Sequence, residues 1–184
     1  MNNNKSVNVR MLVEGGIMIA LAMVLSQFPI YQAPQGGSVT AGSMVPIMIF
    51  AIRWGVTPGI GVGALYGLLH FIFKPYFLNF AQFLFDYIIP FGALGLAGLV
   101  SNFVKKGHKN AYFAIILSST IAVLIRMASH VASGAIFFKE YAGAQNPWIY
   151  SIIYNGTYLI PELILTIIVL VLIWKPIQNS GIND

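Results

Sequence analysis

The chain has 184 residues, of which 58% are hydrophobic, 14% aromatic and only 8% charged, and its formal net charge is +5. Soluble domains carry about 25% charged residues, so this composition predicts an integral membrane protein. The absence of cysteine excludes disulfides, thiol catalysis and thiolate metal sites, and the sequence has no nucleotide-binding GxxxxGK[ST] loop. Any uphill transport would therefore be driven by an ion gradient or by a partner protein.

Six apolar segments predict transmembrane helices, and together they predict an all-α bundle of six helices in a single transmembrane domain, 1–184. The expected spans are residues 9–30, 43–53, 57–73, 78–103, 112–138 and 148–174. The second segment is short, because a full crossing takes about 20 residues. Proline and glycine predict a loop at residues 31–42 (YQAPQGGSVTAG).

Basic residues predict the orientation of these spans, because cytoplasmic loops carry an excess of lysine and arginine. Threading six spans brings seven basic residues to one side of the membrane: Lys5, Arg10, Arg53, Lys105, Lys106, Lys109 and Lys175. Only Lys74 and Lys139 fall on the other side, while Arg126 lies within a span. We therefore expect both termini in the cytoplasm and the loop at 31–42 outside the cell.

The fifth expected span carries Arg126 and His130 inside an otherwise apolar stretch. An ionisable side chain at the bilayer centre costs roughly 2.5–3.5 kcal/mol, so both should face a protein interior or a polar cavity. The two residues are four positions apart and share one helical face, which continues through Gly134.

Depth along the helices, at about 1.5 Å per residue, brings polar side chains of three spans to one level in the outer half of the membrane. These side chains, with the nearby loop residues and aromatic rings, are Asp86, Tyr87, His130, Gly134, Phe138, Tyr141, Trp148, Tyr150, Asn155, Gln35 and Ser38. We predict an outward-facing pocket for a small, flat, polar or cationic ligand. In it Asp86 balances a positive charge, the rings stack, and Asn155 both donates and accepts hydrogen bonds.

Structural interpretations of the same residues stay open. Asp86 and Arg126 could form a buried ion pair, His130 could be a packing histidine, Asn155 could join helices, and Glu162 could pair with Arg126. Rings near the outer ends could form an interfacial belt. Two other functions also stay open: an embedded enzyme with Asp86 and His130 as an acid–base pair, or a stand-alone carrier in which Asp86 or Glu162 carries a proton.

Five blocks of the sequence resemble one family of membrane proteins. They are PQGGSV at 34–39, PIMIFAIRWGVTPGIGVGALYGLL at 46–69, FDYIIPFGALGLAGL at 85–99, RMASHVASGAIFF at 126–138 and WIYSIIYNGTYLIPE at 148–162. In order and spacing they are similar to the thiamine-transporter family called ThiT or YuaJ, over nearly the whole chain. The resemblance implies a substrate-binding S-component of an energy-coupling factor (ECF) transporter. It also implies six helices, an outward-facing thiamine pocket, and a coupling module of one membrane subunit plus two ATPase subunits.

The resemblance implies roles for individual residues as well. The acidic residue and tyrosine of the family's fourth helix match Asp86 and Tyr87. The histidine of the fifth helix matches His130, and the tyrosine and asparagine of the sixth match Tyr150 and Asn155.

Two further regions acquire a role from the same resemblance. The family's aromatic residue after the fifth-helix glycine falls on Phe138, where some members have tryptophan, and the PQGGS loop would be a lid beside the pocket. The small-residue motif of the first helix, which docks the coupling subunit, matches Gly16 and Ala20.

Together with this resemblance, the sequence predicts a multi-pass protein of a bacterial cell membrane that is not an enzyme. The partners that the resemblance implies are thiamine and the ECF coupling module, beside membrane lipid, and we expect no cofactor, metal or nucleic acid. An S-component for a different vitamin and a stand-alone ion-coupled carrier are the alternatives.

Overall fold

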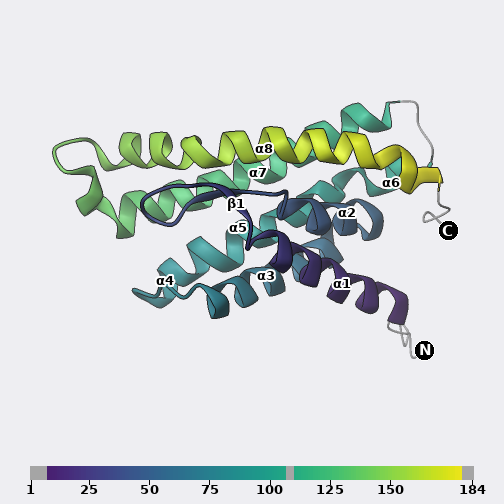
Figure 1. The fold of residues 1–184 in the computed structure, drawn as a ribbon, viewed down its shortest axis with the longest axis horizontal. Helices are drawn as coiled ribbons and strands as arrows, with labels where there is room; N and C mark the ends of the chain where they lie inside the picture. Colours follow the sequence, from purple (N-terminus) through teal and green to yellow (C-terminus); the bar gives the residue numbers. More distant parts are fainter. Residues whose placement is uncertain (1–7, 107–109, 180–184) are drawn as a thin grey trace, which may run out of the picture.

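The protein is built from helices and one short β-hairpin over residues 8–106 and 110–179, which the computed structural model describes (Figure 1). The elements are α1 Val9–Leu25, β1 Pro29–Gln32, β2 Ser38–Thr40, α2 Met44–Trp54, α3 Val56–Phe73, α4 Phe80–Phe83, η1 Leu84–Ile88, α5 Ile89–Ala93, η2 Leu94–Val100, α6 Ser101–Lys105, α7 Ala111–Phe137, η3 Lys139–Ala142 and α8 Pro147–Asn179. The first turns of α1 and the last turns of α8 lie at one end of the molecule, and α4 lies at the other (Figure 1).

Four helical segments of the described residues are long and apolar enough to cross a membrane: Val56–Phe73, Phe80–Lys105, Ala111–Phe137 and Pro147–Pro176. Helix α2 is apolar but has only 11 residues, and α1 has 17. At about 1.5 Å per residue, both are shorter than the roughly 30 Å thickness of a bilayer's hydrocarbon core. The predicted class, an α-helical membrane protein, is confirmed.

The first helix ends at Leu25, before the end of the predicted span 9–30, because the chain turns there into the hairpin. Ser26 caps this end, since its backbone N–H and its hydroxyl both donate to carbonyls of the last turn. Pro29 then begins β1, which pairs antiparallel with β2. The segment 31–42, predicted as a loop, therefore contains most of a hairpin that folds back over the helices (Figure 1).

The fourth predicted span, 78–103, is one helical run that changes pitch along its length, from α4 through α6. Its second segment, Leu84–Ile88, is a π-helical turn, in which the N–H of Ile89 donates to the carbonyl of Leu84. Pro90 follows at once and has no N–H to give to the preceding turn, which explains why the α-helical pattern breaks here. A 3₁₀ segment, Leu94–Val100, follows.

Glycines bring this run into close contact with α2 and α3. A Cβ added to Gly59 would lie 2.6 Å from the Cβ of Ala51 and 3.0 Å from the Cα of Gly95. At Gly63 an added Cβ would lie 3.2 Å from the Cα of Gly92. Small residues therefore let these helices pack backbone against backbone, and this packing holds the π turn at a defined position.

Helices α7 and α8 run side by side along one side of the molecule and are connected through η3 (Figure 1). The hydroxyl of Ser151 on α8 donates to the carbonyl of Val131 on α7 at 2.9 Å. Leu159, Leu170 and Trp174 of α8 are almost completely buried. Of this pair, α7 packs directly against the π turn.

Candidate ligand-binding cavity

A cavity of about 600 Å³ lies between the hairpin, the α3–α4 connection, η1, α7 and α8. The predicted site residues that line it are Gln35, Ser38, Asp86, Tyr87, His130, Gly134, Phe138, Tyr141, Tyr150 and Asn155. Trp148 does not line it: this residue is half-exposed near the start of α8. The structure thus brings together residues from distant parts of the chain in one concave site.

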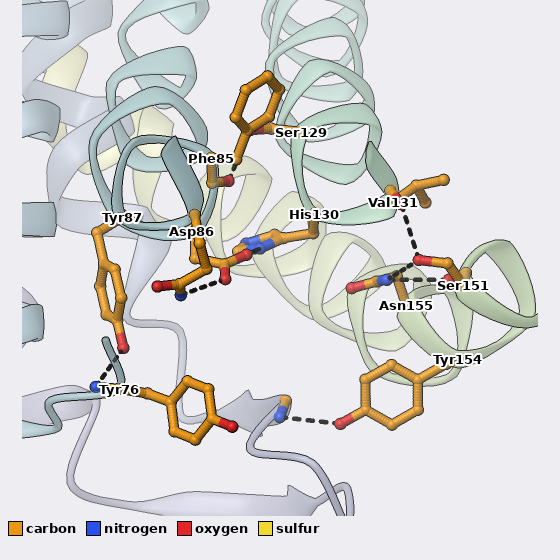
Figure 2. Close-up of polar contacts among 12 residues, drawn as sticks. Tyr76, Phe85, Asp86, Tyr87, Ser129, His130, Val131, Ser151, Tyr154 and Asn155 are labelled. Atoms are coloured by element: carbon orange, nitrogen blue, oxygen red, sulfur yellow. Dashed lines mark hydrogen bonds and ion pairs between the residues drawn. The ribbon is translucent and has the colours of Figure 1, made fainter. Parts of the chain in front are cut away.

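Asp86 lies on the π turn and is held from two sides (Figure 2). Gln82 donates its amide N–H to Asp86 Oδ2 at 2.7 Å, and Gln82 is itself fixed by the N–H of Leu78, which donates to its Oε1 at 3.1 Å. The Nδ1 of His130 lies 3.4 Å from Asp86 Oδ1. The side chains of Asp86 and His130 remain partly accessible, so a ligand in the cavity can reach this pair. The partners of Asp86 are therefore Gln82 and His130, and not Arg126.

Asn155 is buried at the α7–α8 contact (Figure 2). Its amide N–H group donates to the carbonyl of Ser151 at 2.9 Å and to the Ser151 hydroxyl at 3.2 Å, while its Oδ1 accepts from the hydroxyl of Tyr158. Gly134 allows this arrangement, because a Cβ there would collide with the Ser151 hydroxyl. These hydrogen bonds of Asn155 all lie within α8, where it borders the cavity, and Ser151 makes the hydrogen bond to α7.

Aromatic rings surround the cavity mouth. The Tyr76 ring lies 5.6 Å from that of Phe138, and Phe138 stacks on Tyr141 at 6.2 Å between centroids. Desolvation, followed by the neighbouring Tyr141 and Glu140, raises the pKa of Tyr76. Tyr87 is bound differently: its hydroxyl donates to the carbonyl of Lys74 and accepts from the N–H of Tyr76, both at 3.1 Å. Tyr87 thus anchors the α3–α4 connection.

The hairpin is fastened to α8 by side chains that reach across the cavity. The hydroxyl of Tyr154 accepts from the N–H groups of Gln35 and Gly37 at 3.1 and 3.3 Å. Glu162 accepts from the backbone N–H of Thr40 at 2.5 Å and from its hydroxyl at 2.6 Å. The hairpin is therefore held against α8 at two places: Tyr154 binds the PQGGS loop before β2, and Glu162 binds Thr40 at the end of β2.

Arg126 lies in the lining of the same cavity, with its guanidinium carbon 4.5 Å from the centroid of the Phe91 ring. Its Nε and Nη1 have no hydrogen-bond partner among the described residues. Glu162, which the sequence suggested as its partner, uses both carboxylate oxygens on Thr40 instead. The Arg126 guanidinium therefore makes a cation–π contact with the face of the Phe91 ring. Such a contact is worth about 0.5–2 kcal/mol.

Several lining residues were not foreseen from the sequence, among them Tyr76, Gln82, Tyr154 and Ser151. Tyr154 follows Tyr150 by four positions, and the two rings stack at 6.3 Å with 8° between their planes. This spacing on one helical face could have identified it. Gln82 precedes Asp86 by the same four positions and could have been found in the same way, whereas Tyr76 lies in a connection and carries no such signal.

Gly16 and Ala20 lie on the outer face of α1. Both are exposed, and a Cβ added to Gly16 would meet nothing within 4 Å. The opposite face of α1, with Gly15, Ile19 and Ala22, is buried against the rest of the protein. The predicted docking residues are therefore open to a neighbouring molecule.

A bundle of membrane helices around a cavity that combines a carboxylate, an imidazole and several ring faces defines a membrane protein that binds or carries a small molecule. The sequence profile of the family described as "Thiamine transporter protein (Thia_YuaJ)" matches residues 12–180. The chain belongs to this family, whose members are transport proteins and not enzymes. The resemblance found in the sequence is confirmed.

Individual relatives agree with this assignment. The chain is 38% identical over 180 residues to thiamine transporter ThiT of Bacillus subtilis, covering 93% of each chain. It is 30% identical over 172 residues to thiamine transporter ThiT of Lacticaseibacillus paracasei, covering 86% of this chain and 83% of the relative. A solved structure of ThiT from Listeria monocytogenes matches with a TM-score of 0.80 and 27% identity, covering 95% of this chain and 97% of that one.

Proposed function

We propose that the protein is the substrate-binding S-component of an ECF-type vitamin transporter, which captures thiamine outside the cell and delivers it inward through ATP hydrolysis by partner subunits. The observation that carries the proposal is the Asp86–His130 pair in a cavity bordered by aromatic rings, in a chain of the thiamine transporter family.

Thiamine has two parts that suit this cavity. Its thiazolium ring is a permanent cation, for which Asp86 supplies a fixed negative charge and the rings of Tyr76, Phe138 and Tyr150 supply faces; each cation–π contact is worth roughly 0.5–2 kcal/mol. Its aminopyrimidine ring needs hydrogen-bond partners. His130 lines the cavity, and its Nε2 is a buried hydrogen-bonding atom with no partner among the described residues, so the ring holds an unused polar group beside the proposed ligand.

The proposed topology has six membrane helices in a single domain, 1–184, with both termini in the cytoplasm of a bacterial cell and the cavity facing outside. The excess of basic residues on one side supports it, as does the position of α1's start and α8's end at one end of the molecule (Figure 1). In this topology the short helices α1 and α2 cross a bilayer that thins locally around them, and the hairpin that joins them completes the crossing.

The proposed partner is the ECF coupling module, a transmembrane coupling subunit plus two ATPase subunits. The open face of α1 around Gly16 and Ala20 supports docking there, because small residues allow close helix approach in a membrane. Lipid covers the remaining apolar surface.

Uptake of labelled thiamine into cells tests the assembly part of this proposal. Cells that express the protein together with the coupling module should accumulate thiamine, and cells that express the protein alone should not. Equal uptake without the module would contradict the S-component proposal and favour an ion-coupled carrier. Uptake of another vitamin only would overturn the choice of ligand.

Gly134→Ala should weaken thiamine binding. The added Cβ collides with the Ser151 hydroxyl, which also accepts from Asn155, and such overpacking costs about 1–3 kcal/mol. Isothermal titration of the purified variant measures the loss. The matched control is Gly156→Ala on α8, where the added Cβ would lie 3.6 Å from Ile160, an ordinary contact. If Gly134→Ala bound thiamine as tightly as wild type, the close approach of Gly134 to Ser151 would have no part in shaping the ligand site.

Tyr154→Phe should release thiamine faster than wild type. The variant keeps the ring but loses the hydroxyl that holds Gln35 and Gly37, and each such hydrogen bond contributes about 0.5–1.5 kcal/mol. Stopped-flow dissociation measures the rate. Tyr31→Phe, on the exposed strand β1, is the control. An unchanged dissociation rate would mean that the Tyr154 hydroxyl does not retain the hairpin over the ligand.

A further inference from the structure

The π turn leaves one backbone carbonyl without a donor from its own helix. In an α-helix the N–H of Ile89 would donate to Phe85, but here it donates to Leu84. The next donor along a π turn would come from residue 90, which is proline and has no N–H. A carbonyl that is shielded from water and has no hydrogen-bond partner is destabilising, so the turn needs a donor from elsewhere.

Ser129 of α7 supplies that donor. Its hydroxyl lies 2.7 Å from the Phe85 carbonyl oxygen (Figure 2). Ser129 is buried and does not line the cavity. His130 follows Ser129 in the chain, and Asp86 follows Phe85. These two residues form the second contact between the helices, with His130 Nδ1 3.4 Å from Asp86 Oδ1. The two helices are thus joined twice in succession, once through the backbone carbonyl and once through the ligand-facing side chains.

We propose that Ser129 is a positioning residue of the ligand site: its hydrogen bond to Phe85 holds the π turn in the register that directs the Asp86 carboxylate toward His130. The inference rests on the proposed function, since it concerns the same site. Return to an α-helical register would rotate one side of the turn by about 100° relative to the other. Asp86 would then leave its place opposite His130. Gln82, which holds the second carboxylate oxygen, is carried on the segment before the turn.

Ser129→Ala tests the proposal with thiamine as the probe. The variant leaves the Phe85 carbonyl without a donor, and we expect the dissociation constant for thiamine to rise about tenfold or more. Ser129→Thr keeps a hydroxyl and should recover part of the affinity. Ser119→Ala is the matched control, because Ser119 is a fully buried serine of the same helix whose hydroxyl has no partner among the described residues. It should bind thiamine as wild type does.

A double-variant cycle separates positioning from general destabilisation. If Ser129 acts through Asp86, Ser129→Ala should cost little additional affinity in an Asp86→Ala background. An equal loss in both backgrounds, or wild-type affinity of Ser129→Ala alone, would overturn the proposal.

Nitrogen NMR of His130 in the ligand-free protein gives a readout that does not depend on thiamine. The Nδ1 signal should change in Ser129→Ala and not in Ser119→Ala, because only the first variant moves Asp86 away from the ring. An unchanged signal in Ser129→Ala would overturn the inference. Wild-type protein that fails to bind thiamine would instead overturn the proposed function, while the NMR comparison still tests the role of Ser129.

Discussion

Asp86→Asn should weaken thiamine binding by at least about 1.5 kcal/mol, which is about a tenfold or greater rise in the dissociation constant. The substitution keeps the size of the side chain but removes the charge that balances the thiazolium ring. In the wild-type protein the carboxylate accepts from Gln82 at 2.7 Å and lies 3.4 Å from His130 Nδ1. The substitution replaces one of its oxygens with an amide N–H group, which cannot accept a hydrogen bond. Isothermal titration calorimetry of the purified protein measures this change.

A control separates this specific contact from the general loss of a negative charge. Glu140 is exposed on η3, between α7 and α8, and Glu140→Gln should bind thiamine with unchanged affinity. If Asp86→Asn also kept wild-type affinity, the carboxylate would have no part in recognising the cation, and the ligand assignment would lose its electrostatic basis.

Gly16→Leu should abolish uptake while leaving thiamine binding intact. A leucine on the open face of α1 would keep a second helix from approaching closely. Gly16 is not among the residues that line the cavity, so the site itself should be unaffected. Co-purification with the coupling module should fail for this variant, and for Ala20→Leu as well.

Gly61→Leu is the matched control, since Gly61 is an exposed glycine of α3 whose added Cβ would also meet nothing within 4 Å. It should assemble and transport normally. Recovery of the intact complex with both α1 variants would disprove docking through this face, and loss of assembly with Gly61→Leu would show that any bulky residue on the lipid-facing surface interferes.

The helical membrane class and the meeting of polar residues from three segments could be predicted from the sequence, because both depend on local composition and on the fixed rise of a helix. Asp86, His130 and Asn155 come from three separate segments, and they line one cavity. Depth alone was enough to bring them together. It could not say how each side chain is held, since Asn155 is bound by Ser151 and Tyr158 within the protein.

The hairpin and the π turn could not be predicted in the same way, because long-range contacts stabilise both. The strand β2 depends on Glu162, which lies 122 residues further along the chain and binds Thr40. Pro90 signals a break in the helix, but the register after the break depends on Ser129. The suggested pairing of Glu162 with Arg126 failed for a related reason: a nearby backbone N–H competes for the carboxylate.

The measurement that tests the central claim most directly is an isothermal calorimetric titration of the purified, ligand-free protein with thiamine. We expect saturable binding at submicromolar thiamine without ATP or any partner, because the cavity and its carboxylate belong to this chain alone. The absence of saturable binding by protein shown to be folded would contradict the account.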